Sequence, residues 1–307
     1  MAKEDKDLME SGAKVKLGTS DKIIRGFGYV FLTLYSICCI IPFIIIVSTS
    51  FTSESVIRAE GVQFLPKDIT LTAYDMVTKS GGIWWSYVVT ILLTVIGTGI
   101  GLSIIAMTGY ALQRKDFPFR NGISFFIYFK SLFQAGLAPY YLLMTQTYHL
   151  KDNYLAVLLP LLMSPWLIIL MKNFVKSIPH EITESGKIDG AGDMRIFVSL
   201  ILPMLKPALA TIGLFLALGY WNEWYQSSLF LSSRVAVKPL QFTLYEIVNK
   251  TDALKNSVAG QFINLADIPQ ESVKMANAVL ATGPIVMLYP FVQKYFISGI
   301  TVGAVKG

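Results

Sequence analysis

Residues 184–203 read ESGKIDGAGDMRIFVSLILP, a stretch with five charged residues and three glycines that lies between long apolar runs. Charges at this density keep a segment out of the hydrocarbon core of a membrane. Ser185 and Gly186 are small, so another protein is able to approach the backbone there closely. From the residues alone, the segment is either a docking element for a partner protein or an ordinary loop at the membrane surface.

The local sequence predicts two short helices in this segment. Ser177 and Pro179 indicate a helix start, because serine caps helices and proline suits the first turn. We expect this helix to include residues 180–188 and to end before Gly190, which adopts the positive φ that reverses the chain. A second helix is predicted to restart near Asp193 and to lead into the next apolar run.

The composition is that of a polytopic membrane protein. Of 307 residues, 53% are hydrophobic and 15% are charged, whereas a soluble domain is usually about 25% charged. The mean hydropathy is +0.54. The net charge of +6 does not predict nucleic-acid binding, because the basic residues punctuate apolar runs instead of forming a patch. Cys38 and Cys39 are adjacent in an apolar run, so they support no disulfide.

Six apolar runs predict an all-α fold with six transmembrane helices. A spanning helix needs ~20 residues, and lipid leaves the backbone few alternatives to a helix. The predicted spans are residues 26–53, 80–113, 131–150, 153–171, 196–222 and 275–293. The third is open to extension back to residue 121.

Lysine and arginine set the predicted topology, since they are enriched in cytoplasmic loops. They lie before the first span, after the second and fourth spans, and in the tail. With an even number of spans, both termini are therefore cytoplasmic. The predicted organisation is a cytoplasmic segment at 1–25, a transmembrane domain at 26–296 and a cytoplasmic tail at 297–307. The domain contains the charged loop 177–203, between the fourth and fifth spans, and an extracytoplasmic loop at 223–274.

The sequence gives no basis for enzymatic chemistry. It has no GxxxxGK[ST] phosphate loop, and its two histidines, His149 and His180, fall in different loops. No metal-ligand spacing or Ser/His/Asp set can be assembled from these residues. We therefore expect a non-enzymatic chain without a metal or cofactor of its own.

Two features inside the spans have structural explanations. Gly97 and Gly101 form a GxxxG pattern, which predicts close packing of another helix and not nucleotide binding. Lys130 and Lys206 interrupt apolar runs near cytoplasmic span ends, where snorkelling to the interface explains them. A pore-lining role for Lys130 is the alternative.

The sequence WNEWY, residues 221–225, lies where the fifth span ends. One interpretation is an aromatic belt at the membrane interface. The other is a sugar contact, because aromatic faces stack on pyranose rings and amide or carboxylate groups bind hydroxyls. The candidate pathway residues, including similar chemistry in the third span, are Gln134, Tyr140, Tyr141, Trp221, Asn222, Glu223 and Trp224.

The charged segment also resembles a known family. Glu184, then Asp189-Gly190-Ala191, then eight residues and Leu200-x-Leu202-Pro203 is similar to the signature loop of ATP-binding-cassette (ABC) importer permeases. The ending ISGITVGAVKG and the preceding FVQKYF resemble carbohydrate permeases of the maltose-system type. GLAPYYLL, KPALATIGLFLALGYWNEWY, KPLQ and ESVKMA resemble a subgroup associated with oligosaccharides or polysaccharide fragments. Where the family loop usually opens Glu-Ala-Ala, this chain has Gly186 at the third position, which costs a helix roughly 0.5 to 1 kcal/mol.

This resemblance implies a bacterial, multi-pass cell-membrane permease subunit whose charged segment is a coupling helix. The implied partners are a second related permease chain, two ATPase subunits that hold ATP and Mg²⁺, an extracytoplasmic solute-binding protein and an oligosaccharide substrate. The implied contacts of the coupling segment with the ATPase are Glu184, Ser185, Gly186, Asp189, Gly190, Ala191 and Arg195. The implied tail contacts are Gly303, Val305, Lys306 and Gly307.

The expected mechanism is alternating access driven by ATP binding in the partner. Two alternatives stay open at this stage. One is an ABC permease for a non-sugar solute, such as an amino acid or a peptide. The other is a stand-alone transporter, which more often carries paired ionisable residues at mid-membrane, and the predicted spans contain none.

Overall fold

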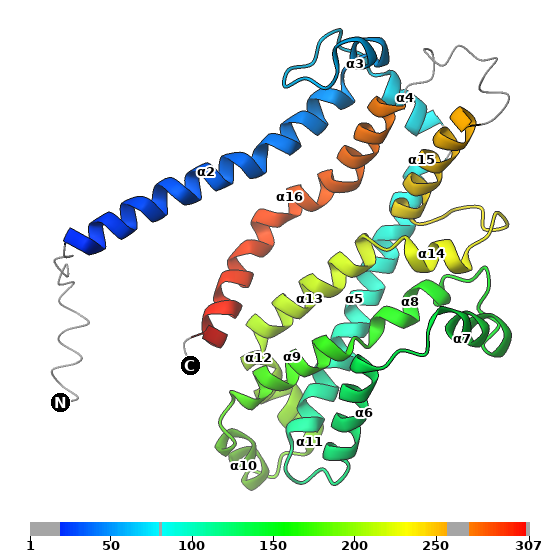
Figure 1. The fold of residues 1–307 in the computed structure, drawn as a ribbon. Coiled ribbons are helices and arrows are strands. Elements are labelled where there is room, and N and C mark those ends of the chain that lie inside the picture. The colour runs from blue at the N-terminus through cyan, green and yellow to red at the C-terminus, as the bar shows by residue number, and fades with distance from the viewer. Residues whose placement is uncertain (1–18, 80–81, 257–269, 305–307) are drawn as a thin grey trace.

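The computed structural model describes residues 19–79, 82–256 and 270–304, and the regular secondary structure in this part of the chain is helical, with one isolated β-bridge between Thr52 and Ile69. The all-α prediction is confirmed (Figure 1). The helices are α2 Thr19–Ser50, α3 Glu54–Glu60, α4 Thr72–Lys79, α5 Ile83–Gln113, α6 Arg120–Leu132, α7 Leu137–Leu142, η1 Leu143–Thr147, α8 Leu155–Leu162, α9 Pro165–Lys176, α10 Glu181–Ile188, α11 Asp193–Ile196, η2 Phe197–Ile201, α12 Leu202–Met204, α13 Lys206–Trp221, α14 Tyr225–Phe230, α15 Leu240–Asn256 and α16 Glu271–Ala304.

The centre of the molecule is α5, which packs against α13, α8 and α9. Ile105, Met171 and Ile212 are fully buried in the largest apolar cluster, to which α5, α9 and α13 contribute. The predicted packing role of the GxxxG pattern is confirmed. A Cβ on Gly97 would lie 2.3 Å from the Tyr220 ring, and one on Gly101 would lie 3.3 Å from a Leu216 methyl group. Both glycines thus let α13 approach α5 closely.

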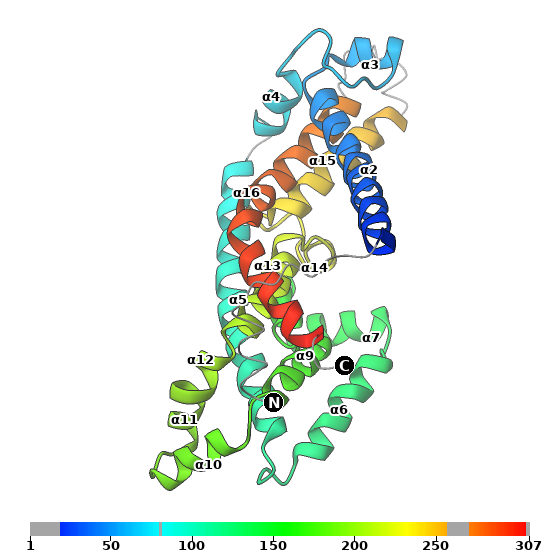
Figure 2. The same cartoon turned by 90° about the vertical axis from the view of Figure 1, so that its left-hand side faces the viewer.

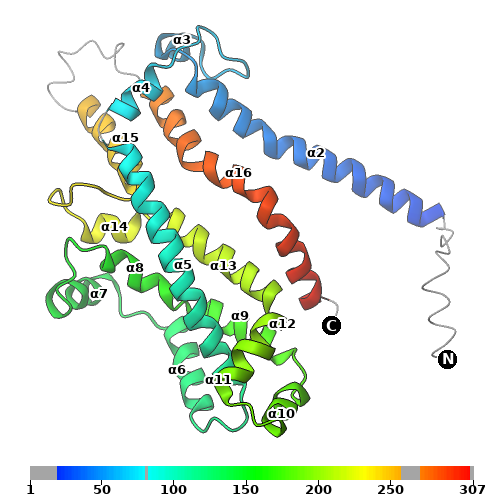
Figure 3. The same ribbon diagram turned by 180° about the vertical axis from the view of Figure 1, so that it is seen from behind.

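Helix α2 lies at the edge of the fold, and little of the rest of the chain packs against it. It contacts α16 and diverges from it toward Thr19, as Figures 1 and 3 show. Phe27, Tyr29 and Phe31 are each more than half exposed, as are most other large apolar side chains on this helix. A surface this apolar is stable only in lipid or against another chain.

Three helical stretches in the described residues are long and apolar enough to cross a bilayer, at Lys22–Ser50, Ile83–Gln113 and Leu155–Lys176. They correspond to the first, second and fourth predicted spans. The fifth is a bent pair, Asp193–Met204 and Lys206–Phe230, at 83°. Pro207 lies in the first turn of α13, and its missing N–H helps to end the preceding helix. The sixth predicted span lies within α16.

Two local predictions were wrong. The third span is not one helix, because α6 ends at Leu132 and α7 begins only after Gly136, which has φ +89°. Ser177 does not cap α10. It follows α9, where its hydroxyl donates to the Phe174 carbonyl at 2.7 Å. Helix α10 begins at Glu181, two residues after Pro179, and its first turn has no side-chain cap.

Candidate functional site

The charged segment forms the predicted helix–turn–helix at one end of the molecule, opposite α3 and α4 (Figure 2). Helix α10 ends at Ile188, and Gly190 has φ +77°. The Ala191 N–H donates to the Gly186 carbonyl at 2.9 Å, which closes the turn. Glycine is favoured at such a position because other residues are strained at positive φ.

Gly186 faces its own chain. A Cβ there would lie 3.0 Å from Leu200 Cδ1 and 3.1 Å from Ile196 Cγ1. The small residue therefore lets α10 pack on α11 and η2. Its departure from the usual alanine is a local packing feature of this segment.

The outer surface of the segment combines charges with exposed apolar side chains. Glu184, Ser185, Asp189 and Arg195 are all exposed. Ile188 is 85% exposed and Met194 is 64% exposed. The sequence interpretation missed these two residues, although isolated apolar residues in a charged loop were a usable signal. Large apolar side chains that protrude at a turn are suited to entering a groove on another protein.

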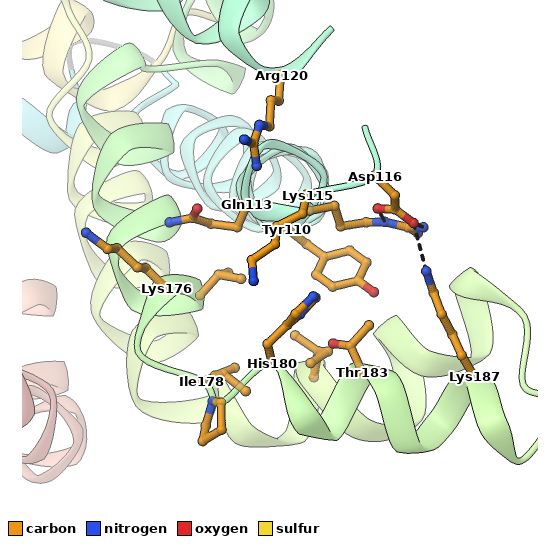
Figure 4. Close-up of a pocket in the computed structure, with 14 residues that line it drawn as sticks. Tyr110, Gln113, Lys115, Asp116, Arg120, Lys176, Ile178, His180, Thr183 and Lys187 are labelled. Carbon is orange, nitrogen blue, oxygen red and sulfur yellow. Dashed lines mark hydrogen bonds and ion pairs between the residues drawn. The ribbon is translucent and has the colours of Figure 1, made fainter. Parts of the chain in front are cut away.

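A network of ion pairs joins the segment to the end of α5. The Arg114 guanidinium pairs with Asp116 at 2.5 Å and with Asp193 of α11 at 2.7 Å. Lys187 of α10 reaches Asp116 at 2.7 Å (Figure 4). The Arg114 hydrogen bonds, followed by that from Lys187, hold the pKa of Asp116 well below its usual range. We call these four residues the latch.

From the sequence, Arg114 and Lys187 are predicted only to set topology, as basic residues after the second and fourth spans. Asp116 is 71 residues from Lys187 in the chain, so no local spacing reveals the contact. The latch therefore connects the end of α5 to both short helices of the segment.

At the opposite end, two predicted pathway residues serve the fold. The Trp221 indole N–H donates to the Ala281 carbonyl of α16 at 3.0 Å, and Trp221 is 7% exposed. Glu223 is equally buried, and its carboxylate accepts the N–H groups of Gln226 and Ser227 and the Ser227 hydroxyl. Glu223 therefore caps α14.

The tyrosines of the third predicted span pack beside α14. The Tyr140 hydroxyl donates to the Gln226 side-chain oxygen at 2.8 Å. The Tyr141 ring stacks on Phe230 with centroids 5.8 Å apart. Gln134 lies exposed between α6 and α7. The structure therefore does not bring Gln134 and the WNEWY residues into one cavity lining.

Trp224 lines a cavity of about 300 Å³ between α15 and α16. Its ring lies 4.8 Å from that of Tyr245, and both side chains are about 40% exposed. Gln241 and Asn277 also line this cavity. Asn277 is 4% exposed, and neither polar atom of its amide has a hydrogen-bond partner in the part of the chain that the structure describes. We call these four residues the aromatic cleft.

Asn222 lies beside the aromatic cleft, where its side-chain oxygen is 3.5 Å from the Gln241 amide nitrogen. Tyr245, Gln241 and Asn277 were missed in the sequence, since they are distant from WNEWY in the chain and lie on other helices.

The remaining predicted contacts lie at the C-terminus. Gly303 is in the last turn of α16, whereas Val305, Lys306 and Gly307 lie outside the described residues. In residues 19–79, 82–256 and 270–304, no group of three or more His, Cys, Asp or Glu side chains could hold a metal ion.

Comparison with known proteins places this arrangement in a family. Residues 121–302 match the model of the binding-protein-dependent transport system inner membrane component. The polygalacturonan/rhamnogalacturonan transport system permease protein YtcP of Bacillus subtilis is 34% identical over 279 residues, which cover 91% of this chain and 96% of YtcP. Protein LplC of Bacillus subtilis is 35% identical over 268 residues, which cover 87% of this chain and 90% of LplC.

A solved structure is similar along nearly the whole chain. It is the crystal structure of a bacterial ABC transporter involved in the import of the acidic polysaccharide alginate, with a TM-score of 0.76 and 32% identity. The match covers 91% of this chain and 99% of the other. The chain therefore belongs to the family of binding-protein-dependent transport system inner membrane components, and it is a membrane permease subunit of an ABC transporter and not an enzyme.

Proposed function

We propose that this chain is one of two permease subunits of an ATP-driven importer of oligosaccharides in a bacterial cell membrane. Several relatives carry names of sugar permeases, among them YtcP and the maltodextrin transport system permease protein MdxG of Bacillus subtilis, which is 29% identical over 291 residues. The partners are a related permease chain, two ATPase subunits with ATP and Mg²⁺, and an extracytoplasmic binding protein. The uncovered face of α2 supports a partner permease in the membrane.

The proposed topology is six spans with both termini in the cytoplasm. It is supported by the three long apolar helices, by the bent pair and by α16. The broken stretch formed by α6, α7 and η1 is the third crossing. This topology puts the charged segment in the cytoplasm and residues 223–274 outside.

The observation that carries the proposal is the coupling segment. It is a helix–turn–helix with protruding Ile188 and Met194, and the latch ties it to α5. When ATP closes the ATPase pair, a docked α10 moves with it and pulls on Arg114. The central helices then exchange inward-facing and outward-facing states, because ATP favours one state of the assembly. Residues 303–307 are the second proposed contact with the ATPase.

The test is to purify the tagged chain from its native membrane in mild detergent and to identify what accompanies it. We expect a second permease chain and an ATPase. Ile188→Asp with Met194→Asp should remove the ATPase, because a charge is unfavourable in an apolar docking groove. Leu65→Asp, an equally exposed site in the loop between α3 and α4, is the matched control. Recovery of the ATPase by the double variant at the wild-type level would contradict docking through this surface.

The aromatic cleft, with Asn222, is the proposed sugar contact. The negative faces of Trp224 and Tyr245 attract the C–H groups of a pyranose ring, and the Asn277 amide offers a donor and an acceptor to hydroxyls. Trp224→Ala should raise the KM of uptake roughly fivefold to tenfold, as expected for losing an aromatic contact of about 1–1.5 kcal/mol. Trp84→Ala, an exposed tryptophan at the start of α5, should leave KM unchanged. Equal KM values for both variants would exclude the cleft from the pathway.

A further inference from the structure

A second cavity, of about 290 Å³, opens between the ends of α5 and α9 and the coupling helix α10 (Figure 4). Five lysine and arginine side chains, one histidine and one acidic side chain line it. The acidic group, Asp116, is already engaged by the latch. Lys115, Arg120 and Lys176 take part in no ion pair or side-chain hydrogen bond within residues 19–79, 82–256 and 270–304. The cavity is therefore strongly electropositive.

Tyr110 also lines this cavity, and its hydroxyl is buried at the cavity wall. Tyr110 is 8% exposed, and its hydroxyl has no hydrogen-bond partner among the described residues. Its ring is fixed by Phe197, 5.2 Å away, and by the Arg114 guanidinium, 5.9 Å from the ring centroid. Figure 4 shows Lys115 and His180 pointing toward the centre of the cavity beside the Tyr110 ring. Because an unpartnered buried hydroxyl is unfavourable, an acceptor from outside the chain is expected here.

The depth of the cavity in the bilayer follows from α5. Exposed apolar side chains run along this helix from Trp84 to Met107, a length of about 35 Å at the helical rise of about 1.5 Å per residue. This length matches a hydrocarbon core of about 30 Å. Tyr110 and Arg114 follow within two turns, and Arg120 begins α6, whose Phe125 and Phe126 are exposed. The cavity therefore lies at the level of the lipid headgroups.

We infer that this cavity binds a phosphate-bearing anion, and specifically the headgroup of an anionic phospholipid from the cytoplasmic leaflet. Lysine and arginine side chains bind phosphate oxygens through charge-assisted hydrogen bonds, and the Tyr110 hydroxyl donates a further bond. Basic pockets between helices at the cytoplasmic side are suited to such headgroups. The bound lipid would contact both α5 and the coupling helix, so lipid composition would affect how firmly the segment is held.

The test uses the full chain in nanodiscs that mix phosphatidylglycerol with phosphatidylcholine, followed by native mass spectrometry of the retained lipid. Lys115→Gln with Arg120→Gln should lower retention of phosphatidylglycerol roughly twenty-fivefold, since each cation near an anionic surface contributes about fivefold. Tyr110→Phe, which keeps the ring packing, should lower it severalfold. Lys151→Gln with Arg234→Gln removes two exposed cations at the opposite end and should change nothing.

Three results would overturn the inference. The first is equal retention of phosphatidylglycerol by the Lys115/Arg120 double variant and the wild type. The second is retention of phosphatidylcholine by the wild type at the same level as phosphatidylglycerol. The third is saturable binding of inorganic phosphate that displaces the lipid. The last result would assign the cavity to a soluble anion. Unfolding of the variants is monitored by tryptophan fluorescence, and Tyr110→Phe gives a second readout because it breaks no ion pair.

Discussion

The helices at the two ends of the molecule are held together by different electrostatic interactions. At the proposed coupling end, the latch consists of ion pairs in which the Asp116 side chain is 47% exposed and that of Asp193 is 58% exposed. At the opposite end, two carboxylates are buried and cap helices. Glu54 of α3 accepts the N–H groups of Glu271 and Ser272 at the start of α16, and Glu223 caps α14 in the same way.

This difference indicates which end is able to move. Exposed ion pairs are worth about 0–1 kcal/mol each and weaken with salt, so the latch can rearrange at low cost. A buried carboxylate that satisfies backbone donors is costly to remove, because the donors are then left without partners. The end that contains α3 and α14 is therefore expected to be rigid, and the charged segment at the other end is expected to be able to move.

The largest predicted effect is at Glu223. Glu223→Ala leaves two backbone N–H groups and the Ser227 hydroxyl without their acceptor, which should cost about 3 kcal/mol. Thermal unfolding in detergent, followed by tryptophan fluorescence, measures this loss. Glu223→Gln keeps one acceptor oxygen and should lose less. A melting temperature for Glu223→Ala equal to that of the wild type would contradict the capping role.

Glu54→Gln should have a smaller effect, about 1–2 kcal/mol at neutral pH, because a charged acceptor is replaced by a neutral one. Burial raises the pKa of Glu54, but the Ser272, Glu271 and Gln270 backbone N–H groups outweigh it, so the pKa lies below its usual value of 4.5. A lowered pKa means that the stabilisation is complete above pH 4.5 and is lost as the pH falls below it.

The difference in melting temperature between wild type and Glu54→Gln should therefore shrink as the pH falls below 4.5. Asp75→Asn, which removes an exposed pair with Lys79, is the control and should behave like wild type at neutral pH. A difference that stays constant down to pH 3 would show that the carboxylate charge has no part in holding α16.

Asp116→Asn tests the coupling end and should change stability by less than about 1 kcal/mol, because its pairs are half exposed. Hydrogen exchange of residues 181–190 should nevertheless accelerate, since α10 loses its tie through Lys187. About 1 M salt should produce the same local change in the wild type, where the screening length is about 3 Å. Exchange in α14 should not change in either case, and acceleration there would contradict the contrast between the two ends.

The sequence was informative where the chain is locally determined. The helix pair around Gly190 follows from residue spacing, and so does the approach of α13 at Gly97 and Gly101. The single helix predicted for residues 131–150 was wrong, because hydrophobicity along a run does not report the backbone break at Gly136. The number of spans remains a prediction, since composition alone does not place a bilayer.

Contacts between distant segments could not be read from the sequence. Glu54 caps a helix 217 residues away, and Asp116 meets Lys187 only when α5 and α10 are packed together. Tyr245 and Asn277 reach Trp224 from two other helices. At WNEWY the residue types suggested a sugar contact, but the structure shows two of them, Trp221 and Glu223, in packing and capping contacts.

The smallest predicted effect is at Gly186, and it tests whether the coupling segment is preorganised. Gly186→Ala gains helix propensity of up to about 1 kcal/mol, but the new methyl group presses on Leu200 Cδ1 at 3.0 Å and on Ile196 Cγ1 at 3.1 Å. Both contacts are with side-chain atoms that are able to shift slightly, so the two effects should nearly cancel. Gly186→Leu is the matched variant, in which the larger side chain cannot be accommodated. Hydrogen exchange of residues 181–190 should be unchanged in the first variant and faster in the second, whereas faster exchange in both would show that α10 needs glycine to pack at all.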